Sequence, residues 1–303
     1  MPWNPSEIPD QSGRVAVITG ANSGIGFKAA RHLAEKGATV IMACRNLEKA
    51  RAARARLPAD ANVRIVELDL GSQASVKKAA EEILAEHPRL DLLLNNAGIM
   101  WLEEGRTEDG FERQFGINHL GHFTLTALLL PALRDVPGSR IVTVSSIAHR
   151  AGRIHFDNIH LEGQYGRQRA YAQAKLANLM FAVELDRRLQ SSGAQTRSLA
   201  CHPGIASTNL AGPGIAEETP LGIGRVVRWL WPLMTQSAEK GAWPTLYAAT
   251  APQAEGGHYY GPARLKEAIG PPREARPRRY AMDPEKGQRL WALSESLTGQ
   301  HFP

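Results

Sequence analysis

Short runs of β-branched and other apolar residues alternate with longer amphipathic stretches from residue 14 onward. The apolar runs predict buried strands at residues 14–19, 39–43, 63–68, 91–95, 140–144 and 196–200. The amphipathic stretches predict helices at residues 24–35, 47–57, 72–86, 108–133 and 170–189. Because the strand runs are continuously apolar, helices must cover both faces of the sheet. The pattern predicts an α/β fold: a doubly wound parallel sheet of about seven strands in a three-layer α/β/α arrangement.

Three segments depart from this alternation. Residues 147–169 are long and polar, which is typical of functional or loosely structured loops. Residues 205–240 hold an apolar cluster around Trp229–Met234 in a region that should be a crossover. Residues 264–280 combine prolines with charged residues and are expected to be irregular, before a final helix from Asp283 or Pro284 to Leu297. Without an internal repeat or a Gly/Ser linker, we expect a single domain over residues 1–303 with a C-terminal extension at about 262–303.

The composition is that of an average soluble globular protein, with 303 residues, 43% hydrophobic and 22% charged. It excludes disordered and collagen-like chains. No apolar run approaches the roughly 18 to 20 residues that a membrane span needs, and residues 1–10 do not have the pattern of a secretory signal. The two cysteines, Cys44 and Cys201, end predicted strands about four strand steps apart, roughly 19 Å, which is too far for a disulfide. We expect both to stay reduced and the protein to be cytoplasmic.

A glycine-rich turn lies between the first predicted strand and the first predicted helix. Glycines there let the backbone turn sharply, and the helix N-terminus attracts an anion such as a pyrophosphate. The spacing is Gly-x3-Gly-x-Gly, and a tight strand-to-helix turn without a ligand is the alternative interpretation. The candidate cofactor-binding residues of this turn are Gly20, Asn22, Ser23, Gly24, Ile25 and Gly26.

The end of the second predicted strand bears on which nucleotide would bind. A carboxylate at this place would accept the ribose hydroxyls of NAD, whereas an arginine accommodates a 2′-phosphate. The residues here are Cys44 and Arg45, so the sequence predicts NADP(H). A solvated surface arginine is the alternative for Arg45.

Tyr171 and Lys175 lie four residues apart on a predicted helix, so a phenol and an ammonium share one helix face. That helix follows the predicted strand that ends at Val144–Ser146. Because ligands bind at the carboxyl ends of strands in such sheets, this pair is placed where chemistry is expected.

With these features the sequence resembles the short-chain dehydrogenase/reductase family, over about residues 12–299. The features that carry the resemblance occur in the family's order: TGANSGIG (19–26), DL (69–70), NNAG (95–98), Asn118, VSS (144–146), YxxxK (171–175) and PG (203–204). ACRN (43–46), CHPG (201–204) and RLWALSESLTG (289–299) are similar to the retinol dehydrogenase-like branch. The resemblance implies a Rossmann-type fold with a helical substrate lid at about 205–240. Several relatives have an N-terminal hydrophobic anchor; this sequence has none, so we expect a soluble enzyme.

The resemblance implies four catalytic residues. Tyr171 would donate a proton to a carbonyl oxygen during reduction, or accept one during alcohol oxidation. Lys175 would favour the phenolate and hold the nicotinamide ribose, and Ser146 would hydrogen-bond the substrate oxygen. Ser145 is the alternative to Ser146, because adjacent strand residues point in opposite directions. Asn118 would hold a water that links Lys175 to solvent, or would have a structural role that is compatible with this relay.

The resemblance also implies further contacts to the cofactor. Asp69, next to Leu70, would receive the adenine amino group. Ile205 and Thr208 would meet the nicotinamide carboxamide. The floor of the cleft would be made by Asn96, Ala97 and Gly98.

The histidines and the charge do not change this interpretation. No metal-ligand spacing occurs, and we expect His119, His122, His149 and His202 to be packed or hydrogen-bonded rather than catalytic. The net charge of +6 is concentrated in residues 45–56 and 264–280, each with a surplus of four. The first cluster begins at the predicted 2′-phosphate site, so we expect no nucleic-acid partner; the second has no assigned role.

The substrate is inferred from the apolar cluster of residues 229–234, which favours a lipophilic carbonyl or alcohol. Packing of these side chains against the body or another subunit is the alternative. Two other functions remain: a non-catalytic NADP(H)-binding sensor, and a carbon–carbon double-bond reductase of the protochlorophyllide reductase type. Both a monomer and a homo-oligomer (dimer or tetramer) remain open.

Overall fold

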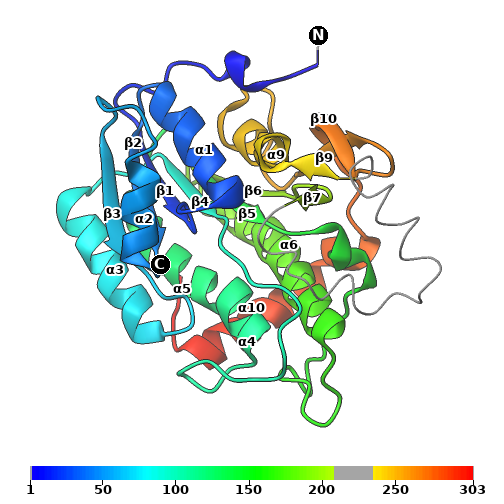
Figure 1. Cartoon of the computed structure of the whole chain (residues 1–303). Helices are drawn as coiled ribbons and strands as arrows, with labels where there is room; N and C mark the ends of the chain where they lie inside the picture. Colours follow the sequence, from blue (N-terminus) through cyan, green and yellow to red (C-terminus); the bar gives the residue numbers. More distant parts are fainter. Residues whose placement is uncertain (1, 208–234, 303) are drawn as a thin grey trace, which may run out of the picture.

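The computed structural model describes residues 2–207 and 235–302, and at its centre is one eight-stranded sheet (Figure 1). Its strands are β1 (Val15–Thr19), β2 (Thr39–Cys44), β3 (Val63–Glu67), β4 (Leu92–Asn95), β5 (Arg140–Val144), β6 (Arg197–Cys201), β9 (Tyr259–Arg264) and β10 (Ile269–Glu274). The order across the sheet is β10-β9-β6-β5-β4-β1-β2-β3, and all neighbours are parallel except β9 and β10. The predicted doubly wound α/β fold is confirmed, with an antiparallel strand added at one edge.

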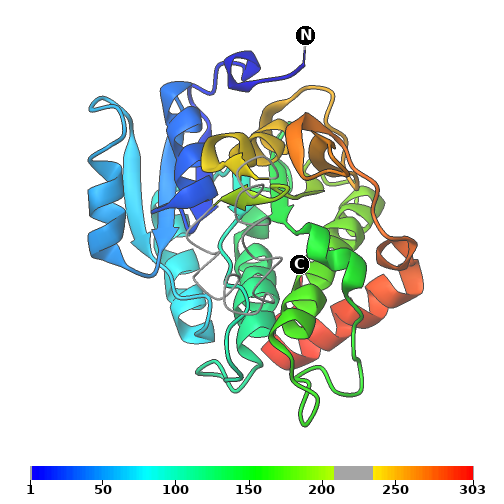
Figure 2. The ribbon, with the colours of Figure 1, turned by 45° about the vertical axis from the view of Figure 1, so that its right-hand side comes forward.

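Helices cover both faces of this sheet (Figures 1 and 2). They are α1 (Gly24–Glu35), α2 (Leu47–Arg54), α3 (Gln73–Glu86), α4 (Arg113–Phe115), α5 (Gly121–Leu129), α6 (Arg167–Ser191), α9 (Ala238–Thr250) and α10 (Pro284–Thr298). Successive strand residues face opposite sides: Ile18 packs with α1, α2 and α9, whereas Val17 packs with α3, α5 and α6. The inner strands β1, β2, β4 and β5 are therefore buried along almost their whole length, whereas the edge strands β3 and β10 are only partly buried.

The stretch predicted as one helix at residues 108–133 is divided. Helix α4 begins only at Arg113, because residues 107–110 form a turn with Gly110 at φ +83° and the buried Glu112 carboxylate caps the helix. A π-helical turn, Gly116–Leu120, then joins α4 to α5. Such turns widen a helix locally and occur frequently at functional sites. Here the turn contains the candidate residue Asn118.

The expectation of an irregular segment at residues 264–280 is wrong for residues 269–274. Residues Ile269–Glu274 form β10, which pairs antiparallel with β9. Pro271 and Pro272 are tolerated because β10 is an edge strand and because its register with β9 shifts between Ile269 and Pro272. The final helix is confirmed as α10, Pro284–Thr298.

The predicted lid at 205–240 lies mostly outside the described residues, and so does Thr208. The two ends of this segment come together: β7 (Ala206–Ser207) pairs in parallel with β8 (Gln236–Ser237). Helix α9, which follows directly, was not predicted. It packs on α1 and on the strands β4, β5 and β6.

The two cysteines lie on β2 and β6, four strand steps apart in the observed order. Both are free and buried. The sequence argument against a disulfide is confirmed.

Candidate active site

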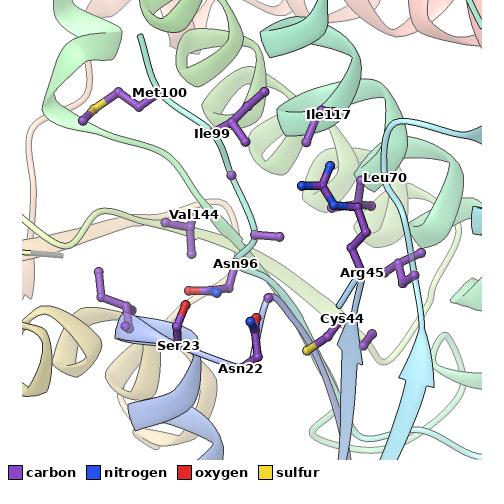
Figure 3. A pocket seen from close by; sticks show the side chains of 18 of the residues that line it. Asn22, Ser23, Cys44, Arg45, Leu70, Asn96, Ile99, Met100, Ile117 and Val144 are labelled. Atoms are coloured by element: carbon purple, nitrogen blue, oxygen red, sulfur yellow. The ribbon is translucent and has the colours of Figure 1, made fainter. Parts of the chain in front are cut away.

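A cleft of about 540 Å³ opens at the carboxyl ends of the parallel strands. It is lined by the turn between β1 and α1, by residues at or after the ends of β2, β3, β4, β5 and β6, and by helix α6. Figure 3 shows Arg45 and Leu70 at one end of it and Met100 and Val144 toward the other. The predicted site residues that line it are Gly20, Asn22, Ser23, Gly24, Ile25, Gly26, Arg45, Asp69, Leu70, Asn96, Ala97, Gly98, Tyr171 and Lys175.

The glycine turn brings three backbone segments into close contact. A Cβ at Gly26 would lie 2.4 Å from Asn96 Nδ2 and 2.5 Å from the carbonyl oxygen of Gly20. Gly20 itself has φ +67°, a conformation that favours glycine. Helix α1 begins at Gly24, and the side chain of its N-cap residue Ser23 makes no capping hydrogen bond. The helix thus presents an N-terminus without a side-chain cap to the cleft, which suits an anionic ligand.

The Arg45 end of the cleft contains a second cation that the sequence analysis did not single out. Arg45 is 71% exposed, and its Nη1 lies 3.9 Å from Asp69 Oδ2. Asn46 caps α2 by accepting a hydrogen bond from the Lys49 N–H at 2.8 Å, and Lys49 also lines the cleft. Arg45 precedes the helix, so the signal that could have identified Lys49 was its membership of the basic run of residues 45–56.

Tyr171 and Lys175 lie on α6 as predicted, and both line the cleft. Lys175 is buried, its Nζ donates to the carbonyl oxygen of Val144 at 3.0 Å, and it lies 5.9 Å from the Tyr171 ring centroid. Burial lowers the pKa of Lys175 to about 8. Burial also raises the pKa of Tyr171, while a hydrogen bond with the Ser146 hydroxyl lowers it by less. The free site therefore holds a protonated phenol next to a readily deprotonated ammonium.

The two candidate serines have different partners. The Ser145 hydroxyl donates to the carbonyl oxygen of Lys175 at 2.7 Å, so it is bound to the backbone of α6. The Ser146 hydroxyl accepts from the Ala148 N–H at 3.2 Å and is hydrogen-bonded to Tyr171. Ser146 is thus the serine that bonds to the phenol, whereas Ser145 is the one among the residues that line the cleft.

Asn118 lies beside the cleft, in the π-helical turn. Its Oδ1 accepts from the Ile99 N–H at 2.8 Å and its Nδ2 donates to the Ile99 carbonyl at 3.0 Å. A Cβ on Gly98 would lie 3.1 Å from Asn118 Oδ1 and 3.3 Å from Lys175 Nζ. Asn118 and Lys175 therefore approach the same glycine from two sides.

The segment after β4 has a second anchor, Gln114, which sequence analysis missed. Gln114 is fully buried and its Oε1 accepts from the N–H of Trp101, which has φ +56°. Its Nε2 donates to the hydroxyl of Tyr165 at 3.1 Å and to the carbonyl of Arg167, the first residue of α6, at 3.0 Å. Ile99 and Met100 on this segment line the cleft, so Gln114 connects that wall to the helix of Tyr171.

Ile205 is not among the residues that line the cleft, and it lies two residues after Pro203, which is. The N–H of Ile205 donates to Ala268 and its carbonyl accepts from Gln236.

The four histidines near the motifs are all buried, and burial lowers the pKa of each of them: His119, His122, His149 and His202. Across residues 2–207 and 235–302, no three His, Cys, Asp or Glu side chains are grouped as for a metal ion.

Comparison with known proteins identifies the class. The model of the family described as short chain dehydrogenase matches residues 14–218. The chain belongs to the short-chain dehydrogenase family and is an oxidoreductase.

Individual relatives indicate which branch of the family this chain resembles. Human retinol dehydrogenase 13 is 40% identical over 302 residues, covering 96% of this chain and 86% of that protein. Mouse polyprenol dehydrogenase is 40% identical, covering 98% of this chain and 87% of that protein. The similarity to the retinol dehydrogenase-like branch is thereby confirmed.

Solved structures agree with this result. An uncharacterized protein from Mycobacterium paratuberculosis is 41% identical with a TM-score of 0.84, and the match covers 100% of both chains. The Pseudomonas aeruginosa RhlG/NADP active-site complex is 25% identical with a TM-score of 0.64, covering 82% of this chain and 94% of that one.

In the part of this chain that the structure describes, no helix is both long and apolar enough to cross a membrane.

Proposed function

We propose that this chain is an NADP(H)-dependent oxidoreductase that transfers a hydride between nicotinamide and a carbonyl or alcohol of a lipophilic small molecule. The observation that carries the proposal is the Tyr171 and Lys175 pair on a cleft that also holds Arg45 and Lys49, with Ser146 hydrogen-bonded to the Tyr171 phenol. A polar catalytic group and a phosphate-binding end in one cleft match what a dinucleotide requires.

The residues of the cleft fit such a cofactor. The turn at Gly20 and Gly26 leaves no room for a Cβ, and α1 begins there without a side-chain cap. This end would hold the pyrophosphate. When bound, the nicotinamide supplies or accepts the hydride. Ile205 and Thr208 are proposed to meet its carboxamide, with Thr208 outside the described residues.

The preference for NADP(H) rests on charge. Arg45 and Lys49 are two cations on the cleft lining that a 2′-phosphate would neutralise. Asp69 lies close enough to Arg45 to orient it, and its other oxygen accepts from the Gly71 N–H. We propose that Asp69 also receives the adenine amino group, with Leu70 beside it and Asn96, Ala97 and Gly98 forming the floor.

Proton transfer is assigned to Tyr171. Because burial keeps its pKa high, the free site carries the protonated phenol that carbonyl reduction requires. Ser146 would donate a hydrogen bond to the same substrate oxygen as negative charge develops there. Lys175, charged below its pKa of about 8, would stabilise the phenolate that remains after the proton leaves. In alcohol oxidation the same groups act in reverse, and Asn118 with its water would connect Lys175 to solvent.

A lipophilic substrate is supported from two sides. The wall near Tyr171 contains the apolar side chains Ile99, Met100 and Val144. The relatives named above act, by their names, on retinol and on polyprenol, which are both long apolar alcohols. The apolar cluster at 229–234 lies outside the described residues and adds only its sequence to this argument.

The test is a screen of cofactor consumption over aldehydes, ketones and alcohols with NADPH/NADP and with NADH/NAD. We expect turnover with the phosphorylated cofactor and faster rates with long or polycyclic apolar compounds. Binding of NADPH without any turnover would instead support a non-catalytic sensor, and a saturated product with its carbonyl intact would indicate a double-bond reductase. Preference for small hydrophilic carbonyls would contradict the lipophilic assignment.

A further inference from the structure

The loop that follows β4 forms the floor of the cleft and is held by two side chains from distant parts of the chain. Thr19, at the end of β1, accepts hydrogen bonds on Oγ1 from the N–H groups of Asn96 and Ala97, each at 2.9 Å. Asn118, in the π-helical turn, holds Ile99 by both its N–H and its carbonyl. The four residues of the floor are thus fixed at both ends.

A buried histidine joins these two anchors. His122 Nδ1 lies 2.9 Å from the carbonyl oxygen of Asn118, and His122 Nε2 lies 2.9 Å from Thr19 Oγ1. All three residues are at most 1% exposed. The chain of contacts therefore runs from Asn96 and Ala97 through Thr19, His122 and Asn118 back to Ile99.

The hydrogen-bond partners of His122 determine the protonation state of its imidazole ring. A carbonyl only accepts, so the proton of the neutral ring is on Nδ1 and Nε2 accepts from the Thr19 hydroxyl. A protonated ring would have to donate to Thr19 Oγ1, which already accepts two amide protons, and the hydroxyl would have to turn to the carbonyl of Leu94 at 3.3 Å. Burial, with smaller repulsion from Lys175, lowers the pKa of His122 to about 4, in agreement with a neutral ring.

We propose that His122 is a positioning residue of the reaction: by joining Thr19 to Asn118 it fixes the floor Asn96–Ile99 beside Lys175. This inference rests on the proposed function, since the floor matters for catalysis only if it supports the cofactor. The consequence for the site is direct, because Gly98 on this floor leaves only 3.3 Å between a Cβ position and Lys175 Nζ. A floor that moves would change the surroundings of the ammonium and of Asn118 together.

The test compares three substitutions at one position in the full chain. His122→Leu removes both hydrogen bonds; His122→Asn retains a donor close to the backbone for the Asn118 carbonyl; His122→Gln retains an acceptor that reaches Thr19. His119→Leu is the control, because His119 is equally buried on the same helical segment but bonds to Ser294 instead.

Amide hydrogen exchange is the first readout, since it does not depend on turnover. We expect His122→Leu to accelerate exchange at Asn96, Ala97 and Ile99 by at least about tenfold. His122→Gln should protect Asn96 and Ala97 again, and His122→Asn should protect Ile99. His119→Leu should lower the thermal midpoint without a selective change at these amides.

Kinetics are the second readout. His122→Leu should lower kcat about tenfold with a change in KM for NADPH of less than threefold, and the two polar variants should recover part of the loss. Unchanged exchange at the floor in His122→Leu, or equal acceleration in His119→Leu, would overturn the proposal. If wild type shows no turnover with any substrate, the proposed function fails while the exchange result still decides the role of His122. Should His122→Leu not fold, the two polar variants still decide: His122→Gln is expected to release Ile99 alone and His122→Asn to release Asn96 and Ala97 alone, and wild-type exchange at all three amides in both variants would overturn the proposal.

Discussion

Replacing Arg45 by serine tests whether the cleft prefers NADPH over NADH. Arg45 is at the far end of the cleft from Tyr171, is 71% exposed and faces Asp69 at 3.9 Å. The substitution removes a charge that only a 2′-phosphate would use. NADH, which has no such phosphate, is expected to bind as before.

The expected magnitude follows from exposure. Two unit charges about 4 Å apart interact by about 1 kcal/mol in water and about 4 kcal/mol near a protein surface. Because most of the Arg45 side chain is in solvent, the lower part of this range applies, about 1 to 2 kcal/mol, or a loss of roughly 5- to 30-fold in NADPH affinity. The loss should shrink as salt rises, since exposed charges are screened over about 10 Å at 0.1 M.

The assay is a fluorescence titration of NADPH and of NADH at low and at high salt. Arg51→Ser is the matched control, because Arg51 is an exposed arginine on α2, just after Arg45 in the chain, and does not line the cleft. Lys49→Met should produce a similar selective loss. Equal weakening of both nucleotides would mean that Arg45 acts through the fold, and unchanged NADPH affinity would refute the assignment of a 2′-phosphate site.

Three further predictions follow from the same structure. Gly26→Ala should abolish detectable NADPH binding, because its Cβ would lie 2.5 Å from the Gly20 carbonyl oxygen. The control Gly166→Ala, whose Cβ would have its nearest atom 3.7 Å away, should bind NADPH normally. Tight NADPH binding by Gly26→Ala would contradict the assignment of the pyrophosphate to this turn. In carbonyl reduction, kcat/KM for NADPH should fall as pH rises through about 8, because the ammonium of Lys175 is the active form; a profile flat to pH 9 would disagree. The free energy of unfolding should fall as pH decreases below about 6.5, because the unfolded chain then protonates histidines that stay neutral in the folded state: His119 (pKa about 3), His122 and His149 (pKa about 4). Denaturant titrations should show the free energy of unfolding changing by roughly 4 kcal/mol per pH unit near pH 5, and a flat profile would refute this.

The sequence identified those parts of the fold that follow from continuous burial. Strands β1, β2, β4, β5 and β6 are buried along almost their whole length because helices cover both faces, so their pattern was clear. Strand β10 was missed because it is a half-exposed edge with two adjacent prolines, which resembles a loop locally. The π-helical turn was missed because its five residues, Gly116–Leu120, lie inside a longer stretch with a helical pattern, and that pattern does not distinguish a π turn from an α turn.

The candidate site shows the same division. Its glycines and the Tyr171–Lys175 pair have fixed local spacing, so the sequence alone located them at the cleft. His122 and Gln114 act through hydrogen bonds to residues up to 103 positions away in the sequence, and no local sequence pattern predicts such contacts. Lys49 could have been singled out, since it belongs to the basic run of residues 45–56 that begins at Arg45.

The most direct test of the proposed mechanism is the turnover of Tyr171→Phe with NADPH and the best carbonyl substrate of the screen. The substitution removes only the phenolic oxygen, so NADPH affinity should stay within about threefold of wild type. We expect kcat to fall by roughly 10² to 10⁴, the usual contribution of general acid catalysis. A Tyr171→Phe variant that binds NADPH and turns over at the wild-type rate would contradict the assignment of proton transfer to this residue.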